Sequence, residues 1–390
     1  MATRLIVGRA RTRLFVTSQQ MKRLCVGYRE LSNMSDEVLF EAVGSTRIIT
    51  LNRPKALNAL NLNMVEKIIP SLQDWIAPDS KVSMIILKGA GEKAFCAGGD
   101  VRAVTEEGRK DPKSLNATHF FRREYVLDHL IGSCPIPFIA LIDGITMGGG
   151  VGLSVHAPFK VATEKTLFAM PETAIGLFPD VGGSHFLTRL NGALGMYLAL
   201  TGARLKGEHV YKAGIASHYV PHKDGMFEKM TAELLTLSNP TPDSIQDLLA
   251  SFHNQSCTDE PFSLSDQKQQ IDYVFGLSTL EQIFSALEAD HSDWAANTLK
   301  TLKKMSPTSM KVTMEQLRRG AQMSLADCLK MELRICRMTM MNNDFYEGVR
   351  AVLVDKDNQP NWRPATLEAT TDEYVQTYFH PMPDGQELEL

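Results

Sequence analysis

The chain has 390 residues, 44% hydrophobic and 22% charged, which is typical of a soluble globular protein with one large domain or two ordinary ones. Its 41 basic and 45 acidic residues nearly balance, and no run of 18 uninterrupted apolar residues occurs, so no membrane-spanning helix is expected. The six cysteines are scattered without a Cys-x-x-Cys pair, which argues against a disulfide framework or a zinc site and for free thiols.

The first 29 residues differ from the rest, because they contain seven basic residues and no acidic one. This composition is typical of a mitochondrial transit peptide, and the alternative is a disordered basic arm. We therefore expect a leader at residues 1–32 and a protein of the mitochondrial matrix. Without those seven residues, 34 basic residues face 45 acidic ones, which argues against a nucleic-acid partner.

Strand and helix patterns alternate up to about residue 225. The predicted order is a hairpin (38–43 and 46–51), a helix (62–72), a strand (82–87), a helix around 120–125, a strand (138–142) and two short strands (159–162 and 166–169). Strands that alternate with helices predict an α/β core with partly parallel strands. Later segments are predicted as helices only: 244–250, 280–287, 292–305 and 325–340.

The central stretch, 138–154, reads as a buried strand that leads into a glycine-rich helix start. Asp143-Gly144 turns the chain, and Met147 to Gly152 then opens the helix. Unpaired N–H groups at a helix start, together with the positive end of its dipole, can bind an anion or a developing oxyanion. A tight packing junction between strand and helix explains the same glycines, and this stretch alone leaves both interpretations open.

Several common catalytic motifs are missing. The glycine run lacks the third glycine of a dinucleotide-binding fingerprint, Gly152-Leu153-Ser154-Val155-His156 lacks the second glycine of a nucleophile elbow, and no Walker loop occurs. His218 and His222 have helical metal-site spacing, but Pro221 between them argues against it, and we expect no metal. Carboxylates are then the plausible acid/base groups.

Two carboxylates stand out, since each follows a proline in an apolar neighbourhood. Glu172 follows Pro171, and Asp180 follows Pro179. Desolvation in such a neighbourhood raises a carboxyl pKa and suits the group to acid/base work. The structural alternative is that each acid satisfies N–H groups at a helix start.

The ordered motifs resemble those of the crotonase (enoyl-CoA hydratase/isomerase) superfamily over residues 36 to 365. They are Leu51-Asn52-Arg53-Pro54, Asn58-Ala59-Leu60, Lys93 to Asp100, Gly144 to Gly150, Pro171-Glu172, Thr201-Gly202 and Ala213 to Ala216. Two later motifs, Met305 to Ser309 and Phe345 to Ala351, resemble its hydroxyacyl-CoA hydrolase branch. The resemblance implies an α/β fold, a crotonase-like spiral of ββα units at 36–225, followed by a helical C-terminal region at 226–390.

The resemblance also implies the parts of an acyl-CoA site. Backbone N–H groups of Gly99 and Gly149 would form the oxyanion hole that holds the thioester oxygen as it gains charge. Lys55, Lys93 and Arg102 fall where the resemblance implies basic residues near the CoA phosphates and adenine, and the alternative for each is a solvated surface charge.

One departure bears on the reaction. By resemblance, hydratases carry a glutamate after the glycine run, where this chain has Gly152, and a second at the place of Glu172. Asp180 stands where hydratases have glycine, and the Glu172/Asp180 pair is similar to the hydroxyacyl-CoA hydrolase branch. There Glu172 would attack the carbonyl or act as general base on water, while Asp180 would bind the substrate hydroxyl or position the water. Glu124 would line the acyl pocket.

The resemblance therefore implies hydrolysis of a short, branched 3-hydroxyacyl-CoA thioester, such as 3-hydroxyisobutyryl-CoA in valine breakdown. The expected partner is this small-molecule substrate, with CoA as part of it and no metal or redox cofactor. A homo-oligomer is compatible with the resemblance, and the oligomeric state stays open. Two alternatives remain: a hydratase or isomerase on the same fold, disfavoured by Gly152, and a non-catalytic acyl-CoA-binding protein, which would not need Glu172 and Asp180.

Overall fold

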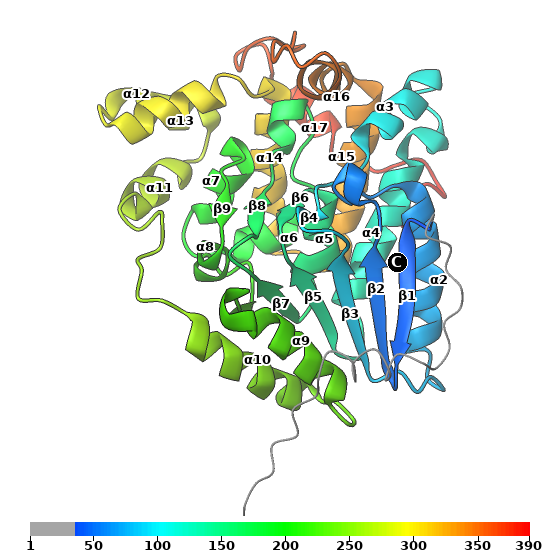
Figure 1. Ribbon diagram of the computed structural model, residues 1–390. Coiled ribbons are helices and arrows are strands. Elements are labelled where there is room, and N and C mark those ends of the chain that lie inside the picture. Colours follow the sequence, from blue (N-terminus) through cyan, green and yellow to red (C-terminus); the bar gives the residue numbers. More distant parts are fainter. Residues whose placement is uncertain (1–35) are drawn as a thin grey trace, which may run out of the picture.

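The computed structural model describes residues 36–390, so the predicted leader at 1–32 lies outside the described residues. Two sheets form the centre of the molecule (Figure 1). The larger has the order β1 (Val38–Val43), β2 (Thr46–Leu51), β3 (Met84–Gly89), β5 (Phe138–Ile142), β7 (Phe159–Ala162) and β10 (His218–Tyr219). The smaller has the order β4 (Ala94–Cys96), β6 (Ile145–Met147), β8 (Leu167–Ala169) and β9 (Leu205–Lys206). Among the strands of the described residues, the β1–β2 and β8–β9 pairs are antiparallel and the other pairs are parallel.

Every residue of strand β5 is buried. Since successive side chains of a strand point to opposite sides, β5 is covered on both faces. Phe138, Ala140 and Ile142 pack into the main core, which also contains the helices around the site. Ile139 and Leu141 face a second, smaller core under α9 (Met226–Thr236) and α10 (Pro242–Ser256). Figure 1 shows these two helices side by side below the larger sheet.

Helices α2 (Leu62–Ile76), α4 (His119–Gly132) and α5 (Gly149–Val155) confirm the helices predicted at 62–72, around 120–125 and after the glycine run. The hairpin is confirmed in register, with Val38 opposite Leu51, and the strand at 138–142 is confirmed with the predicted bounds. The short strands β4 and β6 were not predicted, because three residues are too few for an alternating pattern. Helix α3 (Val101–Lys110) was also missed, since its polar sequence resembles a loop.

The C-terminal part is helical, and β10 is the last strand in the described part of the chain. After α9 and α10, its α-helices are α11 (Lys268–Phe275), α12 (Leu280–Ala289), α13 (Asp293–Leu302), α14 (Pro307–Gly320), α15 (Leu325–Met341), α16 (Asp344–Val349) and α17 (Asp372–Thr377). Side chains of α14 and α15 belong to the same core cluster as β3 and β5. The division at residue 225 stays a prediction, and the two parts share one core.

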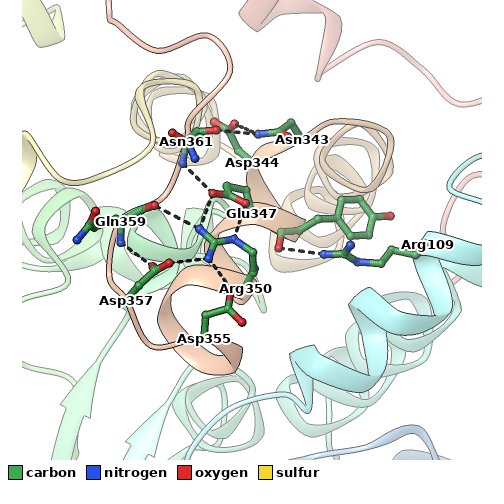
Figure 2. A network of polar contacts seen from close by, with 10 residues as sticks. Arg109, Asn343, Asp344, Glu347, Arg350, Asp355, Asp357, Gln359 and Asn361 are labelled. Atoms are coloured by element: carbon green, nitrogen blue, oxygen red, sulfur yellow. Dashed lines mark hydrogen bonds and ion pairs between the residues drawn. The ribbon is translucent and has the colours of Figure 1, made fainter.

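Helix α16 packs tightly on the short 3-10 helix η3 (Glu172–Ile175). A side-chain carbon on Gly348 would overlap the backbone of Ile175, so the two backbones approach each other closely. After α16, Arg350 pairs with three carboxylates, at 2.8 Å to Glu347, 2.6 Å to Asp355 and 2.7 Å to Asp357. Figure 2 shows this network fastening the following loop beside α16.

The five cysteines in the described part of the chain are free thiols, as their scattered spacing predicts. No helix within residues 36–390 has the length and apolar character needed to cross a membrane.

Candidate active site

Two glycine turns meet at the junction of the smaller sheet and α5. Gly98 and Gly99 follow β4, and Gly148 and Gly149 follow β6. A side-chain carbon on Gly149 would lie 3.2 Å from the Gly99 nitrogen, so the two backbone segments are close together. Neither the Gly99 N–H nor the Gly149 N–H donates a hydrogen bond to another residue within 36–390. Two neighbouring free N–H groups are the donors that an oxyanion hole requires.

Glu172 lies against the second of these turns. It begins η3 directly after Pro171, and its side chain is 4% exposed. Its Oε1 lies 3.0 Å from the place that a side-chain carbon on Gly148 would occupy, and its Oε2 has no hydrogen-bond partner among the described residues. Burial, and then the charge of Asp180, raises the pKa of Glu172 well above its ordinary value.

Asp180 lies on the loop between η3 and α6 (Gly183–Phe186) and is also 4% exposed. The hydroxyl of Tyr125, on α4, donates a hydrogen bond of 2.8 Å to its Oδ2. Burial raises the pKa of Asp180 to about 7, and the Tyr125 hydrogen bond partly offsets this by stabilising the ionised form.

Glu124 completes the group from α4, one residue before Tyr125, and is 2% exposed. A side-chain carbon on Gly149 would collide with its Oε1, so this carboxyl lies directly beside the proposed oxyanion hole. Burial, then Asp180 and then Glu172 raise the pKa of Glu124. The structure therefore brings Glu124, Glu172 and Asp180 together with the two glycine turns, and their roles stay predictions.

The three predicted CoA-binding cations are exposed and form no ion pair within the described residues. Lys55 lies in the 3-10 helix after β2, Lys93 in the loop after β3, and Arg102 in the first turn of α3. Asn58 joins two of these segments, because its side-chain amide donates to the carbonyls of Ala90 and Ala94 at 2.9 and 2.8 Å. Exposed cations without an ion-pair partner can bind phosphate groups.

Sequence reasoning missed two further buried acids. Asp128 lies one helical turn after Glu124 on α4, is 0% exposed, and has no hydrogen-bond partner for either carboxyl oxygen within residues 36–390. Those oxygens lie 2.7 and 2.9 Å from the place that a side-chain carbon on Gly152 would occupy. Asp128 thus fills the space beside Gly152. The i, i+4 spacing from Glu124 is the signal that could have found it.

Glu332, on α15, is the second missed acid. It is 0% exposed, and burial raises its pKa to about 8 against the effect of hydrogen bonds from Ser184 and Gly182. No local pattern links it to residue 182, because 150 positions separate the two in the chain.

A cavity of about 1130 Å³ lies elsewhere, between α7 (Leu194–Thr201), α12, α14 and α17, and none of the predicted site residues lines it. Among the described residues, no group of three or more His, Cys, Asp or Glu side chains is arranged to hold a metal ion. The convergence of acids and free N–H groups, rather than cavity size, identifies the candidate site.

Comparisons with known proteins agree with this geometry. The model of the enoyl-CoA hydratase/isomerase family matches residues 46–379. The chain is 49% identical over 384 residues to a protein of Danio rerio named 3-hydroxyisobutyryl-CoA hydrolase, mitochondrial. The match covers 97% of this chain and 99% of that protein. It is 51% identical over 351 residues to the human protein of the same name, with 89% of each chain covered.

Among solved structures, a carnitinyl-CoA dehydratase from Mycobacterium thermoresistibile superposes with a TM-score of 0.82 at 37% identity, over 91% of this chain and 99% of that one. An enoyl-CoA hydratase from Rhodobacter sphaeroides gives 0.81 at 35% identity, over 91% of this chain and 100% of that one. The extent of these matches and the shared fold lead to one conclusion: the chain belongs to the enoyl-CoA hydratase/isomerase family.

Proposed function

We propose that this protein hydrolyses 3-hydroxyisobutyryl-CoA, and related short 3-hydroxyacyl-CoA thioesters, to the free hydroxy acid and CoA. One observation carries the proposal: Glu172 lies buried against a glycine turn with a free N–H group and within the electrostatic influence of the buried Asp180, while Gly152 cannot exchange a proton. The names of the relatives from Danio rerio and human support the same substrate.

In this proposal the thioester oxygen accepts hydrogen bonds from the Gly99 and Gly149 N–H groups. These donors stabilise the negative charge that develops there, and losing one typically costs about 2.7–4 kcal/mol of barrier. The ionised Glu172 then acts in one of two ways. It attacks the carbonyl to give an acyl-enzyme anhydride that water cleaves, or it takes a proton from the water that attacks. Both routes consume one water and release CoA as the thiol.

The remaining residues supply recognition. Asp180 accepts a hydrogen bond from the 3-hydroxyl of the substrate or positions the water, and Glu124 lines the acyl pocket. Lys55, Lys93 and Arg102 contact the phosphates and adenine of CoA, which is part of the substrate. Since these residues need no metal or redox group for thioester cleavage, we propose a hydrolase without a cofactor.

The test is thiol release over a panel of acyl-CoA esters with and without the 3-hydroxyl. The native protein should cleave 3-hydroxyisobutyryl-CoA, and Glu172→Gln should lower kcat by about 100-fold or more, as for loss of a general base or nucleophile. Glu66→Gln, at a surface ion pair with Arg123, is the matched control. Absence of thiol release with normal binding would favour the non-catalytic alternative, and hydration of an enoyl-CoA would favour the hydratase.

The two chemical routes can be separated by a single turnover in heavy-oxygen water. Label found in the peptide that contains Glu172 requires the anhydride route with water attack at the enzyme carbonyl, whereas label found only in the product fits the other attack modes. Hydroxylamine trapping of an acyl-enzyme then distinguishes covalent attack from general-base catalysis.

We also propose that residues 1–32 direct the protein to the mitochondrial matrix, where the reaction would serve valine breakdown. The basic, acid-free leader and the word mitochondrial in the relatives' names support this. A fluorescent fusion of the full chain should enter mitochondria, and a fusion lacking residues 1–32 should remain in the cytosol.

A further inference from the structure

The loop that carries Asp180 has a strained backbone. Val181 is fully buried and has a φ of +52°, in the left-handed region that β-branched residues rarely adopt. Gly182 follows with a φ of +79°. Such a conformation persists only where surrounding groups hold it, and it occurs most often at functional sites.

Two side chains, one buried and one half-buried, hold the first half of this loop. The Gln316 amide, on α14, donates to the Pro179 carbonyl at 2.6 Å. The His156 ring, directly after α5, lies with Nε2 2.7 Å from the Val181 carbonyl. Because burial lowers the pKa of His156 to about 4, the ring is neutral near pH 7, and the nitrogen facing the carbonyl carries the proton.

Glu332, on α15, holds the second half. Its Oε2 accepts the Gly182 N–H at 2.7 Å, and its Oε1 accepts the Ser184 N–H at 3.0 Å and contacts the Ser184 hydroxyl at 2.5 Å. These three contacts all fall within four residues of Asp180, whose own carboxylate is fixed by Tyr125. One buried carboxyl therefore ties the C-terminal helices to the loop of the candidate site.

We infer that Glu332 is a positioning residue, which holds the 180–184 loop so that the Asp180 carboxylate stays in place for the substrate. Without its acceptors, buried Gly182 and Ser184 donors lose their partners, and unpaired buried donors are costly. The strained turn at Val181 then relaxes and carries Asp180 with it. The activity readout of this inference rests on the proposed function.

If Glu332 only capped α6, its substitution would act independently of Asp180. A double-mutant cycle separates this structural role from the positioning role. Glu332→Gln keeps the side-chain volume but places an amide donor against a backbone donor. We expect it to lower kcat on 3-hydroxyisobutyryl-CoA by about tenfold or more, and by less than about twofold when Asp180→Asn is already present. Glu315→Gln, on the neighbouring α14, should leave kcat unchanged.

Equal fractional losses in the native and Asp180→Asn backgrounds would overturn the inference, because Glu332 would then act independently of Asp180. If Glu332→Gln fails to fold, Ser184→Ala removes a single contact and should show the same non-additivity to a smaller degree. Additive behaviour of Ser184→Ala would overturn the inference in that case.

A crystal structure of Glu332→Gln tests the same point without any substrate. The Tyr125 hydroxyl, 2.8 Å from Asp180 Oδ2 in the native protein, should move beyond hydrogen-bonding distance. An unchanged distance would overturn the positioning role. Absence of thiol release by the native protein would instead overturn only the proposed function, since the structural comparison does not depend on turnover.

Discussion

At the scale of single residues, the candidate site is defined by carboxyl groups whose pKa values are raised by burial. Glu124, Glu172 and Asp180 all have raised pKa values, and the charge of Asp180 contributes to raising the other two. Groups coupled in this way titrate as a set. A reaction that requires ionised Glu172 should therefore depend on the charge of its neighbour.

Asp180→Asn should make Glu172 easier to ionise, because it removes a negative charge that raises the Glu172 pKa. The acidic limb of the kcat/KM profile reports that ionisation in the free enzyme and should move to lower pH, although the overall rate falls. Rates on 3-hydroxyisobutyryl-CoA between about pH 5 and 9 measure this. Asp327→Asn, at the exposed start of α15, should leave the limb in place. A shift to higher pH would contradict the coupling.

Gly152→Ala should destabilise the fold, because its new methyl group would lie 2.7 Å from both Asp128 Oδ1 and the Val181 Cβ. Overpacking of this kind typically costs about 1–3 kcal/mol, which thermal unfolding can detect. Adding Asp128→Gly removes the two carboxyl oxygens and should recover part of the loss. Unchanged stability of the single variant would show that this space is larger than the structure indicates.

At the scale of elements, the position of Glu172 depends on a helix far along the chain. It begins η3, and η3 packs on α16 so closely that neither Gly176 nor Gly348 has room for a side chain. Arg350 then fastens the loop after α16 through three carboxylates (Figure 2). The position of Glu172 is thus supported by the packing of η3 on α16, and the ion pairs of Arg350 lie next to this contact.

Arg350→Ala should loosen residues 355–362 without unfolding the core, because its partners lie near the surface and the core contacts of α16 remain. We expect faster backbone hydrogen exchange in that segment and a larger effect at low salt, where ion pairs are stronger. Arg318→Ala is the control, because within residues 36–390 Arg318 forms one ion pair, with Glu315 three residues earlier. Unchanged exchange at 355–362 would mean that other contacts hold the loop.

At the scale of the whole molecule, the sequence predicted what depends on local pattern. The strand at 138–142, the glycine-rich helix start and the hairpin were all found. The convergence of Glu124, Glu172 and Asp180 came from resemblance, since no spacing rule brings α4, η3 and a loop together. Glu332 escaped prediction because its partners are distant in sequence, and buried contacts of that kind leave no periodic signal. Asp128 lies one helical turn after Glu124, and this spacing was not used.

The buried acids also predict how stability varies with pH. Burial raises the pKa of Asp180 to about 7 and of Glu332 to about 8, so the folded state holds protons that the unfolded state has released. Stability then falls as pH rises through this window. His156 and His218, whose pKa values desolvation lowers to about 4, act in the opposite direction, but only below their ordinary pKa of 6.5.

We therefore expect the free energy of unfolding in urea to decrease between about pH 6.5 and 8. Glu332→Gln cannot release a proton and should flatten this decrease. Stability that stays constant across the interval would show that these carboxyls are already ionised in the folded protein.

The contact between Glu332 and the 180–184 loop joins residues 150 positions apart, and this separation predicts the order in which parts of the protein fold. Contacts between distant segments form slowly, because the intervening chain must first be closed into a loop. The sheets and α4 can assemble from residues already made, whereas the Asp180 loop cannot reach its final shape until α15 has emerged and docked. A chain that ends before α15 should therefore leave the Asp180 loop unfixed. In refolding, we expect the helical signal to return before the thiol release of the proposed function does.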